Sequence, residues 1–152
     1  MGGPMHAHVL FAASILTALA WAAPAKAAIE LEAGLWQTTE TGTEDGEPAE
    51  PEVSNDCMSA EDAKDPVKSL TKLKDQSAGK CQTLDLKQSG NSVSFNFQCG
   101  DRKQMSFDMA ASYTFVDRKN YTGTMKSAVV FGGQKTTADK KIVSKWIGAC
   151  TK

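Results

Sequence analysis

The sequence predicts a mainly β protein, in which an antiparallel meander curls into an open or nearly closed barrel with one short helix and two disulfides. The main evidence is the stretch from Gln104 to Val130, in which apolar and polar side chains alternate. A period of two held this long indicates paired strands with one buried and one solvated face. The second observation is that four cysteines follow an apolar N-terminal leader. The predicted buried face comprises Met105, Phe107, Met109, Ala111, Tyr113, Phe115, Tyr121, Met125, Val129 and Phe131.

Residues 1–27 have the features of a secretory signal peptide. Val9 to Ala23 form an apolar run, and the small-residue motif Ala25-Lys26-Ala27 follows it. The run is too short for a membrane-spanning helix, although an uncleaved anchor is the alternative. Cleavage leaves residues 28–152 as a single β-rich domain without a membrane span, which we expect to be periplasmic or secreted.

The cysteines and histidines limit the chemistry. All four cysteines lie after the leader, and an even count in an exported chain predicts two disulfides. None of the spacings is C-x-x-C, which disfavours a thioredoxin-type site or a zinc knuckle. Both histidines, His6 and His8, lie in the leader, so the mature chain has no histidine base or metal ligand. We therefore expect no metal and no cofactor.

Charge is segregated along the chain. Residues 28–65 contain twelve acids and one base, whereas residues 66–152 contain six acids and fifteen bases. Such asymmetry fits two partners, but attraction between the halves of one fold is the simpler explanation. The bases form no dense cluster, so nucleic acid is not an expected partner.

The N-terminal third is predicted to contain little regular structure. Leu35 to Thr39 is a β-rich run and the expected first strand. Glu40 to Glu52, rich in Glu, Gly and Pro, predicts an extended mobile loop. Calcium binding there is not expected, because the D-x-D-x-D-G pattern is absent. Val53 to Cys57 is a short extended piece.

A helix is predicted to start at Ser59. Its side chain is a candidate N-cap, and Asp62 offers a carboxylate to the first turn. Asp65-Pro66 interrupts the helix, after which Val67 to Leu73 can form a second short turn with Leu70 and Leu73 inward.

The segment 80–98 predicts a hairpin with two competing registers. A three-residue loop, Ser89-Gly90-Asn91, places Cys81 opposite Cys99 within bridging reach. A two-residue loop pairs Leu84 with Phe97 and Leu86 with Phe95, but sends the cysteines to opposite faces. A bulge in the first arm reconciles the two. We expect the pairing Cys81–Cys99 and Cys57–Cys150.

The central hairpin is predicted to turn at residues 118–120. That loop pairs Phe115 with Gly123, Tyr113 with Met125, Met109 with Val129 and Phe107 with Phe131, and apolar residues then face each other at nearly every step. After the turn signal Gly132-Gly133, a last strand is expected from Lys135 to Ile147. Its lysines suit a protected edge strand.

Several short motifs occur together in this order. They are Gly34-Leu35-Trp36, Cys57-Met58-Ser59-Ala60-Glu61-Asp62-Ala63, Ser89-Gly90-Asn91, Tyr121-Thr122-Gly123-Thr124-Met125 and Ile147-Gly148-Ala149-Cys150. With the signal peptide, the set resembles the bacterial exported family called domain of unknown function 3617. The resemblance implies a periplasmic β-rich protein with no assigned activity and no catalytic residues. The chain departs from the family pattern in the segment 40–52.

We expect a non-catalytic binding protein. A curled sheet can hold a small apolar ligand on its inner face, although a filled core is the alternative. A second hypothesis is a protein-binding envelope factor, such as an inhibitor of a wall-cleaving hydrolase, that inserts its acidic segment 40–52 into a basic cleft. An enzyme is not expected, because Asp85 and Asp108 alternate with apolar residues and so face solvent. The candidate ligand-lining residues are Trp36, Phe95, Phe97, Phe107, Tyr113, Met125 and Trp146.

Overall fold

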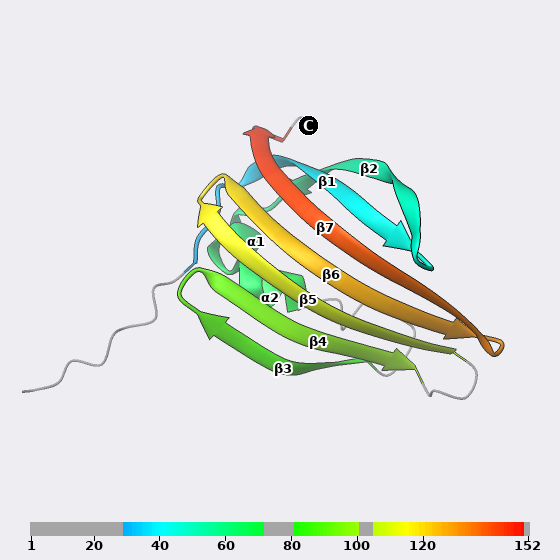
Figure 1. The fold of residues 1–152 in the computed structure, drawn as a ribbon. Helices are drawn as coiled ribbons and strands as arrows, with labels where there is room; N and C mark the ends of the chain where they lie inside the picture. The colour runs from blue at the N-terminus through cyan, green and yellow to red at the C-terminus, as the bar shows by residue number, and fades with distance from the viewer. Residues whose placement is uncertain (1–28, 72–80, 101–104, 151–152) are drawn as a thin grey trace, which may run out of the picture.

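The computed structural model describes residues 29–71, 81–100 and 105–150, which form one antiparallel sheet with two short helices. Its seven strands lie side by side in the order β2-β1-β7-β6-β5-β4-β3 (Figure 1). Within the described residues, the outer edges of β2 and β3 are unpaired, so the sheet is open and not a closed barrel. The strands are β1 (Gly34–Glu44), β2 (Glu47–Met58), β3 (Cys81–Ser89), β4 (Ser92–Gly100), β5 (Met105–Asp117), β6 (Asn120–Phe131) and β7 (Gln134–Gly148).

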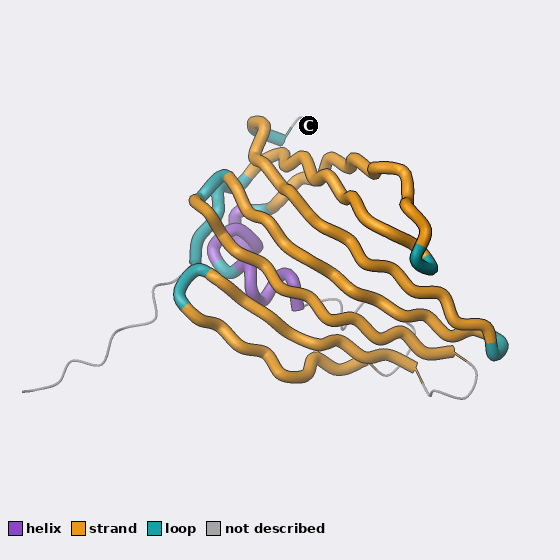
Figure 2. The backbone as a smooth tube through the Cα atoms, in the orientation of Figure 1, coloured by secondary structure: helices purple, strands orange, loops and turns teal. Residues whose placement is uncertain are grey.

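The helices α1 (Ala60–Lys64) and α2 (Pro66–Thr71) lie in the hollow of the curled sheet (Figure 2). Ser59 caps α1 as expected, because its Oγ accepts a 3.1 Å hydrogen bond from the backbone N–H of Asp62. The sequence predicted one helix, whereas the chain forms two. Pro66 ends α1 and begins α2, and the carboxylate of Asp65 accepts from the Lys68 N–H at 3.0 Å. Leu70 is half-buried as predicted, and Leu73 lies outside the described residues.

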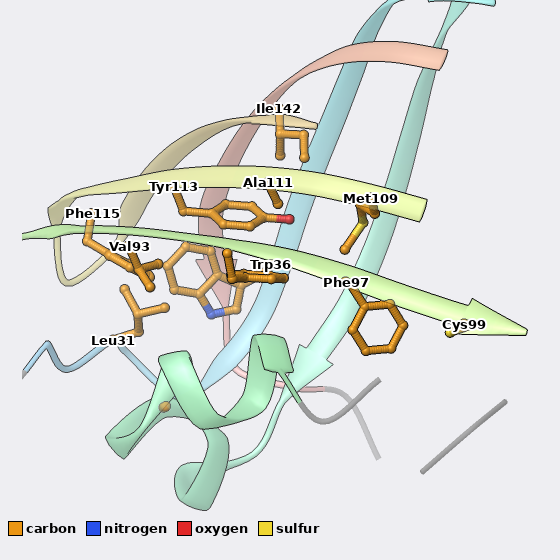
Figure 3. Packing of buried hydrophobic residues seen from close by; sticks show 12 residues of the cluster. Leu31, Trp36, Val93, Phe97, Cys99, Met109, Ala111, Tyr113, Phe115 and Ile142 are labelled. Atoms are coloured by element: carbon orange, nitrogen blue, oxygen red, sulfur yellow. The ribbon is translucent and has the colours of Figure 1, made fainter. Parts of the chain in front are cut away.

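We call the face that carries the helices the concave face, and the opposite one the outer face. The odd-numbered residues of β5 and β6 share the concave face with Trp36, Phe95 and Ile142, as the strand registers show. Figure 3 shows Met109, Tyr113 and Phe115 of β5 on the side of the sheet that faces the helices. The buried core comprises Leu31, Trp36, Ala63, Val93, Phe95, Phe97, Cys99, Met109, Ala111, Tyr113, Phe115 and Ile142.

Both disulfides have the predicted pairing. Cys81 lies directly opposite Cys99 in β3 and β4, with their Cα atoms 4.0 Å apart. The second bridge joins Cys57 in β2 to Cys150 just after β7, with the Cα atoms 5.7 Å apart. It ties the edge hairpin to the end of a central strand.

The β3–β4 hairpin contains both of the registers that the sequence left open. Near the turn Gln88 pairs with Val93, which is the two-residue loop register, whereas Cys81 pairs with Cys99 at the other end. A register shift between Leu84 and Lys87 joins them, and Asp85 has a φ of 52° there. The predicted bulge therefore exists, and it leaves Leu84 and Leu86 exposed.

The predicted register of the central hairpin was wrong by two residues. Phe115 pairs with Tyr121, Tyr113 with Gly123 and Phe107 with Val129. The cause is the turn: the Asp117 carboxylate accepts from the Lys119 N–H at 2.7 Å and from the Asn120 amide at 2.9 Å. This closes a shorter loop with an irregularity between Phe115 and Asp117. A shift of two keeps the same face inward, so the alternation alone could not detect the error.

Two further predictions about strand positions were wrong. The segment 40–52 is not a loop, because β1 pairs with β2 through Glu44 and Glu47 and turns at Asp45-Gly46. The last strand is not an edge, since β7 lies between β1 and β6. Both errors have one origin. Residues 40–44 of the expected loop extend β1, which pairs with β7. Because β7 is then an internal strand, the two edges of the sheet are β2 and β3.

Candidate functional site

The concave face has a covered end and an open end. At the covered end, α1 and α2 pack over Phe115 and Tyr121, and Figure 3 shows Phe115 on the side of the sheet that faces the helices. The opposite end is formed by two cross-strand pairs, Met105–Phe131 and Phe107–Val129. We call these four residues the open end. Met105 is 56% exposed, Val129 38% and Phe131 70%, although the alternation predicted them to be buried. Among the described residues, their strands extend past the part of the sheet that α1 and α2 cover.

Most of the predicted ligand-lining residues are packed in the core. Trp36, Phe95, Phe97 and Tyr113 are each less than 9% exposed. Phe107, Met125 and Trp146 are half-buried and pack against that core. The structure therefore brings all seven to the concave-face core, four inside it and three packed against it, with Trp146 opposite Trp36 in β1.

Tyr121 joins these aromatic rings, and it is missing from the predicted set. Its ring centroid lies 5.4 Å from that of Trp36, 6.1 Å from that of Tyr113 and 5.9 Å from that of Phe115. Its place on the alternating odd-numbered face was the signal that could have identified it. Gly123 makes this packing possible, because a Cβ there would lie 2.6 Å from Cδ1 of Tyr113.

The two tryptophans have fixed orientations. The indole N–H of Trp36 donates to the Glu32 carbonyl at 2.9 Å, and that of Trp146 donates to the Ala33 carbonyl at 3.0 Å. The Lys119 ammonium lies 4.4 Å from the centre of the Trp146 ring. Both indole N–H groups therefore already donate to backbone carbonyls of the same chain.

The space between the helices and the sheet is small. The pocket there has a volume of about 30 Å³ and is lined by residues such as Leu31, Leu70 and Tyr121. A cavity of that size holds about one or two water molecules. The covered end is thus a filled core.

Acidic side chains line the other side of the concave face. Glu40 and Glu44 of β1 lie directly opposite Glu52 and Glu47 of β2. We call these four residues the acidic wall. The whole β1–β2 hairpin, Gly34 to Met58, contains seven acids and no lysine or arginine. The composition of residues 40–52 predicted a loop, in which these carboxylates would not be aligned.

Lys140 of β7 lies beside this wall. Its ammonium contacts Glu44 Oε1 at 2.8 Å, and only 9% of its side chain is exposed. The hydrogen bond that Lys140 donates to Glu44, together with the charges of Glu44, Glu40 and Glu52, raises the pKa of Lys140 against the opposing effect of desolvation. Lys140 therefore stays charged and offsets part of the acidic field.

Tyr113 marks the boundary between the apolar and acidic sides. Burial, and then the nearby Tyr121 and Glu40, raise the pKa of Tyr113 to about 12. Its phenol therefore stays protonated at neutral pH. Glu40, Ile142, Gly123 and Tyr113 follow one another across the strands in a single row.

The outer face has two adjoining shallow grooves, of about 430 and 360 Å³, that share Asn96, Ala110 and Lys126. Lys126 bonds Asp139 at 2.8 Å, and Asn96 donates to Asp85 at 3.0 Å. The grooves are thus lined by small side chains and by polar groups that are already paired with each other.

The described residues contain neither a cluster of metal-ligating side chains nor a membrane-spanning helix. Across residues 29–71, 81–100 and 105–150, no group of three or more His, Cys, Asp or Glu side chains is arranged to hold a metal ion. In the same ranges, no helix has the length and apolar character needed to cross a membrane.

Comparison with known proteins gives one match. A family model described as a protein of unknown function (DUF3617) matches residues 31–150. Neither a curated protein nor a solved structure matches the chain. The match covers every strand of the sheet, both helices and all four cysteines.

Proposed function

Because the chain belongs to the DUF3617 family of proteins of unknown function, we propose its role from the structure: it is an exported, non-catalytic binding protein that holds an apolar ligand at the open end of its concave face. The observation that carries this proposal is the exposure of paired apolar side chains beside a packed core. Met105 and Phe131 face each other across β5 and β6 and are 56% and 70% exposed. Contiguous exposed apolar residues of this kind commonly mark binding surfaces.

Because the covered end is a filled core, the open end is the better position for a ligand. The pocket of about 30 Å³ beneath the helices is far below the 300–1,000 Å³ typical of small-molecule sites. In this proposal Phe107 and Met125 contact the ligand, whereas Trp36, Phe95 and Tyr113 form the rigid floor behind it.

Export and the lack of catalysis rest on separate observations. The apolar leader and the two disulfides suit an oxidising compartment. No histidine follows His8, which removes the commonest general base. Asp85 and Asp108 lie on the outer face, where their carboxylates accept from Asn96 and Gln98.

A neutral apolar fluorophore, N-phenyl-1-naphthylamine, tests the proposal directly. We expect its fluorescence to rise on binding to the oxidised protein, and the double variant M105S/F131S to lose most of that rise. Val53→Ser is the matched control, because Val53 is 57% exposed but lies in β2, away from the open end. A fluorophore that does not bind, or that binds the double variant equally, would remove the proposal. Native mass spectrometry of protein from the cell envelope would show whether a small molecule is retained.

The acidic hairpin favours a second candidate, an envelope factor that inhibits a wall-cleaving hydrolase. Insertion into a basic cleft requires a free hairpin tip. However, the Asp45 N–H donates to the Thr137 carbonyl at 2.8 Å, and its carboxylate accepts from the Thr137 N–H at 2.6 Å, so the tip is held on β7. An inhibition assay with lysozyme-type hydrolases tests this candidate, and a lack of inhibition would exclude this form of it.

A further inference from the structure

The acidic wall places like charges directly opposite each other. Glu44 faces Glu47 and Glu40 faces Glu52 across the β1–β2 ladder, on the same side of the sheet. Like charges directly opposite each other destabilise a sheet. The hairpin therefore carries a local conflict between its sequence and its fold.

The repulsion among these carboxylates is compensated only in part. Lys140 bonds Glu44, whose side chain remains 59% exposed, while Glu47 and Glu52 are also exposed. Salt bridges elsewhere in the described chain, such as Lys126–Asp139, show that this sheet also uses cross-strand pairs of opposite charge. Local conflicts that a fold retains are concentrated at functional surfaces.

The acidic wall lies within reach of the open end. Glu44 pairs with Ala138, which pairs with Ser127, and Val129 follows two residues later on the same face. With strands about 4.8 Å apart and a rise of about 3.3 Å per residue, Glu44 and Val129 are about 12 Å apart along the sheet. An α-helix is about 10–12 Å wide, so a single helical segment can contact both.

We propose that the occupant of the concave face is a cationic amphipathic polypeptide segment. Its apolar side lies on Met105, Val129 and Phe131, and its lysine or arginine side faces Glu44, Glu47 and Glu52. This inference rests on the proposed function, and it names the class of ligand that the same open end takes. Charge complementarity selects the partner, and apolar contact supplies most of the affinity.

The charge distribution favours a polypeptide over a membrane surface. An apolar strand end alone would suit insertion into a lipid interface. However, the hairpin beside it carries seven acids without a base, and anionic lipid headgroups would repel it. Binding to anionic vesicles is therefore an alternative that the experiment must measure.

The probe is a synthetic 18-residue amphipathic helix with leucine on one side and lysine on the other, titrated into the oxidised full chain. We expect binding that weakens with added salt, and a loss of at least about tenfold in affinity for both E47K/E52K and M105S/F131S. The matched control for charge is E30K/E61K, which makes the same change in net charge outside the hairpin. V53S is the control for the apolar substitutions.

Each outcome decides between the two proposals. If the naphthylamine probe binds and the lysine helix does not, the partner class is wrong while the proposed function stands. If neither binds, both fail. Equal binding of a helix with glutamate in place of lysine, or preferential binding to anionic vesicles through Met105 and Phe131, overturns the partner class. Since E47K/E52K removes repulsion, its expected unfolding midpoint is at or above that of the natural chain, and lost binding cannot then be attributed to misfolding.

Discussion

The strands β4–β6 and the hairpin β1–β2 belong to one sheet but are stabilised differently. In β4–β6 the concave face is apolar, and residues such as Phe95, Phe97 and Met109 are less than 9% exposed. In β1–β2 the same face is acidic beyond Trp36 and Thr38, and nearly every residue of β2 is exposed. The first region is held by burial, whereas the second is held by its ladder to β7 and by the Cys57–Cys150 bridge. A hairpin with so little packing is free to carry charges that a core would exclude.

Removing the hairpin's bridge is expected to have the largest effect on stability. The Cys57–Cys150 bridge spans 93 residues and the Cys81–Cys99 bridge spans 18. By loop entropy alone, C57S/C150S should lose about 4.6 kcal/mol and C81S/C99S about 3.2 kcal/mol. Denaturation in guanidinium chloride measures both losses. Equal losses, or a larger one for C81S/C99S, would show that the hairpin does not depend on its bridge.

Truncations of two phenylalanines separate the packed floor from the open end. Phe95→Ala removes a ring that is 3% exposed, and should cost about 3–5 kcal/mol of unfolding free energy. Phe131→Ala removes one that is 70% exposed, and should cost less than about 1 kcal/mol. Urea denaturation of the two variants provides the comparison. A large loss for Phe131→Ala would mean that the open end is part of the core and not a binding surface.

Tyr113 lies at the boundary between the two regions. Deprotonation of its buried phenol is expected to destabilise the protein in alkali. The pKa of Tyr113 is raised from 10.0 to about 12 in the fold, so the unfolded chain loses this proton first as pH rises. The stability that depends on the protonated phenol is fully present below pH 10 and disappears as the pH passes about 12. The shift corresponds to about 3 kcal/mol.

Tyr113→Phe isolates this contribution. Between pH 10 and 12 the variant should lose less stability than the natural chain by up to that amount. Tyr121→Phe removes only a smaller cause of the shift and should retain most of the decline. Parallel unfolding curves at several pH values provide the measurement. Identical pH profiles for the natural chain and Tyr113→Phe would show that the phenol is not desolvated as the structure indicates.

The sequence predicted the parts of the fold that depend on a repeating pattern. The alternation predicted the strand and, from Met109 to Phe115, its buried face, and the cysteine count together with the predicted β3–β4 bulge led to both disulfides. Ser59 and Asp62 gave the helix start through local hydrogen bonding. Each of these features depends on residues close in sequence or on a periodicity, which a single chain displays directly.

The features that sequence reasoning missed depend on distant partners. Glu40 to Glu52 has the composition of a solvated loop, but its pairing with β7 and within the β1–β2 hairpin makes it part of the sheet. The Asp117 hydrogen bonds set the central register, and no hydrophobic pattern reports them. Likewise, the alternation predicted that Phe131 lies on the concave face, but it could not show that the helices α1 and α2 do not reach this residue, which is 70% exposed. The predicted lining residues therefore turned out to be mostly core, and the open end and acidic wall had to be seen in three dimensions.

The acidic wall is expected to lower the stability of the fold and to be retained for binding. The unfolding free energy of Glu47→Gln, measured in low and high salt, tests this expectation most directly, with Glu30→Gln as the control for net charge. Glu47 faces Glu44, so its neutralisation should stabilise the protein by about 0.5 kcal/mol in low salt, and by less in high salt where charges are screened. A variant that is destabilised, or that gains no more than Glu30→Gln in low salt, would contradict the account.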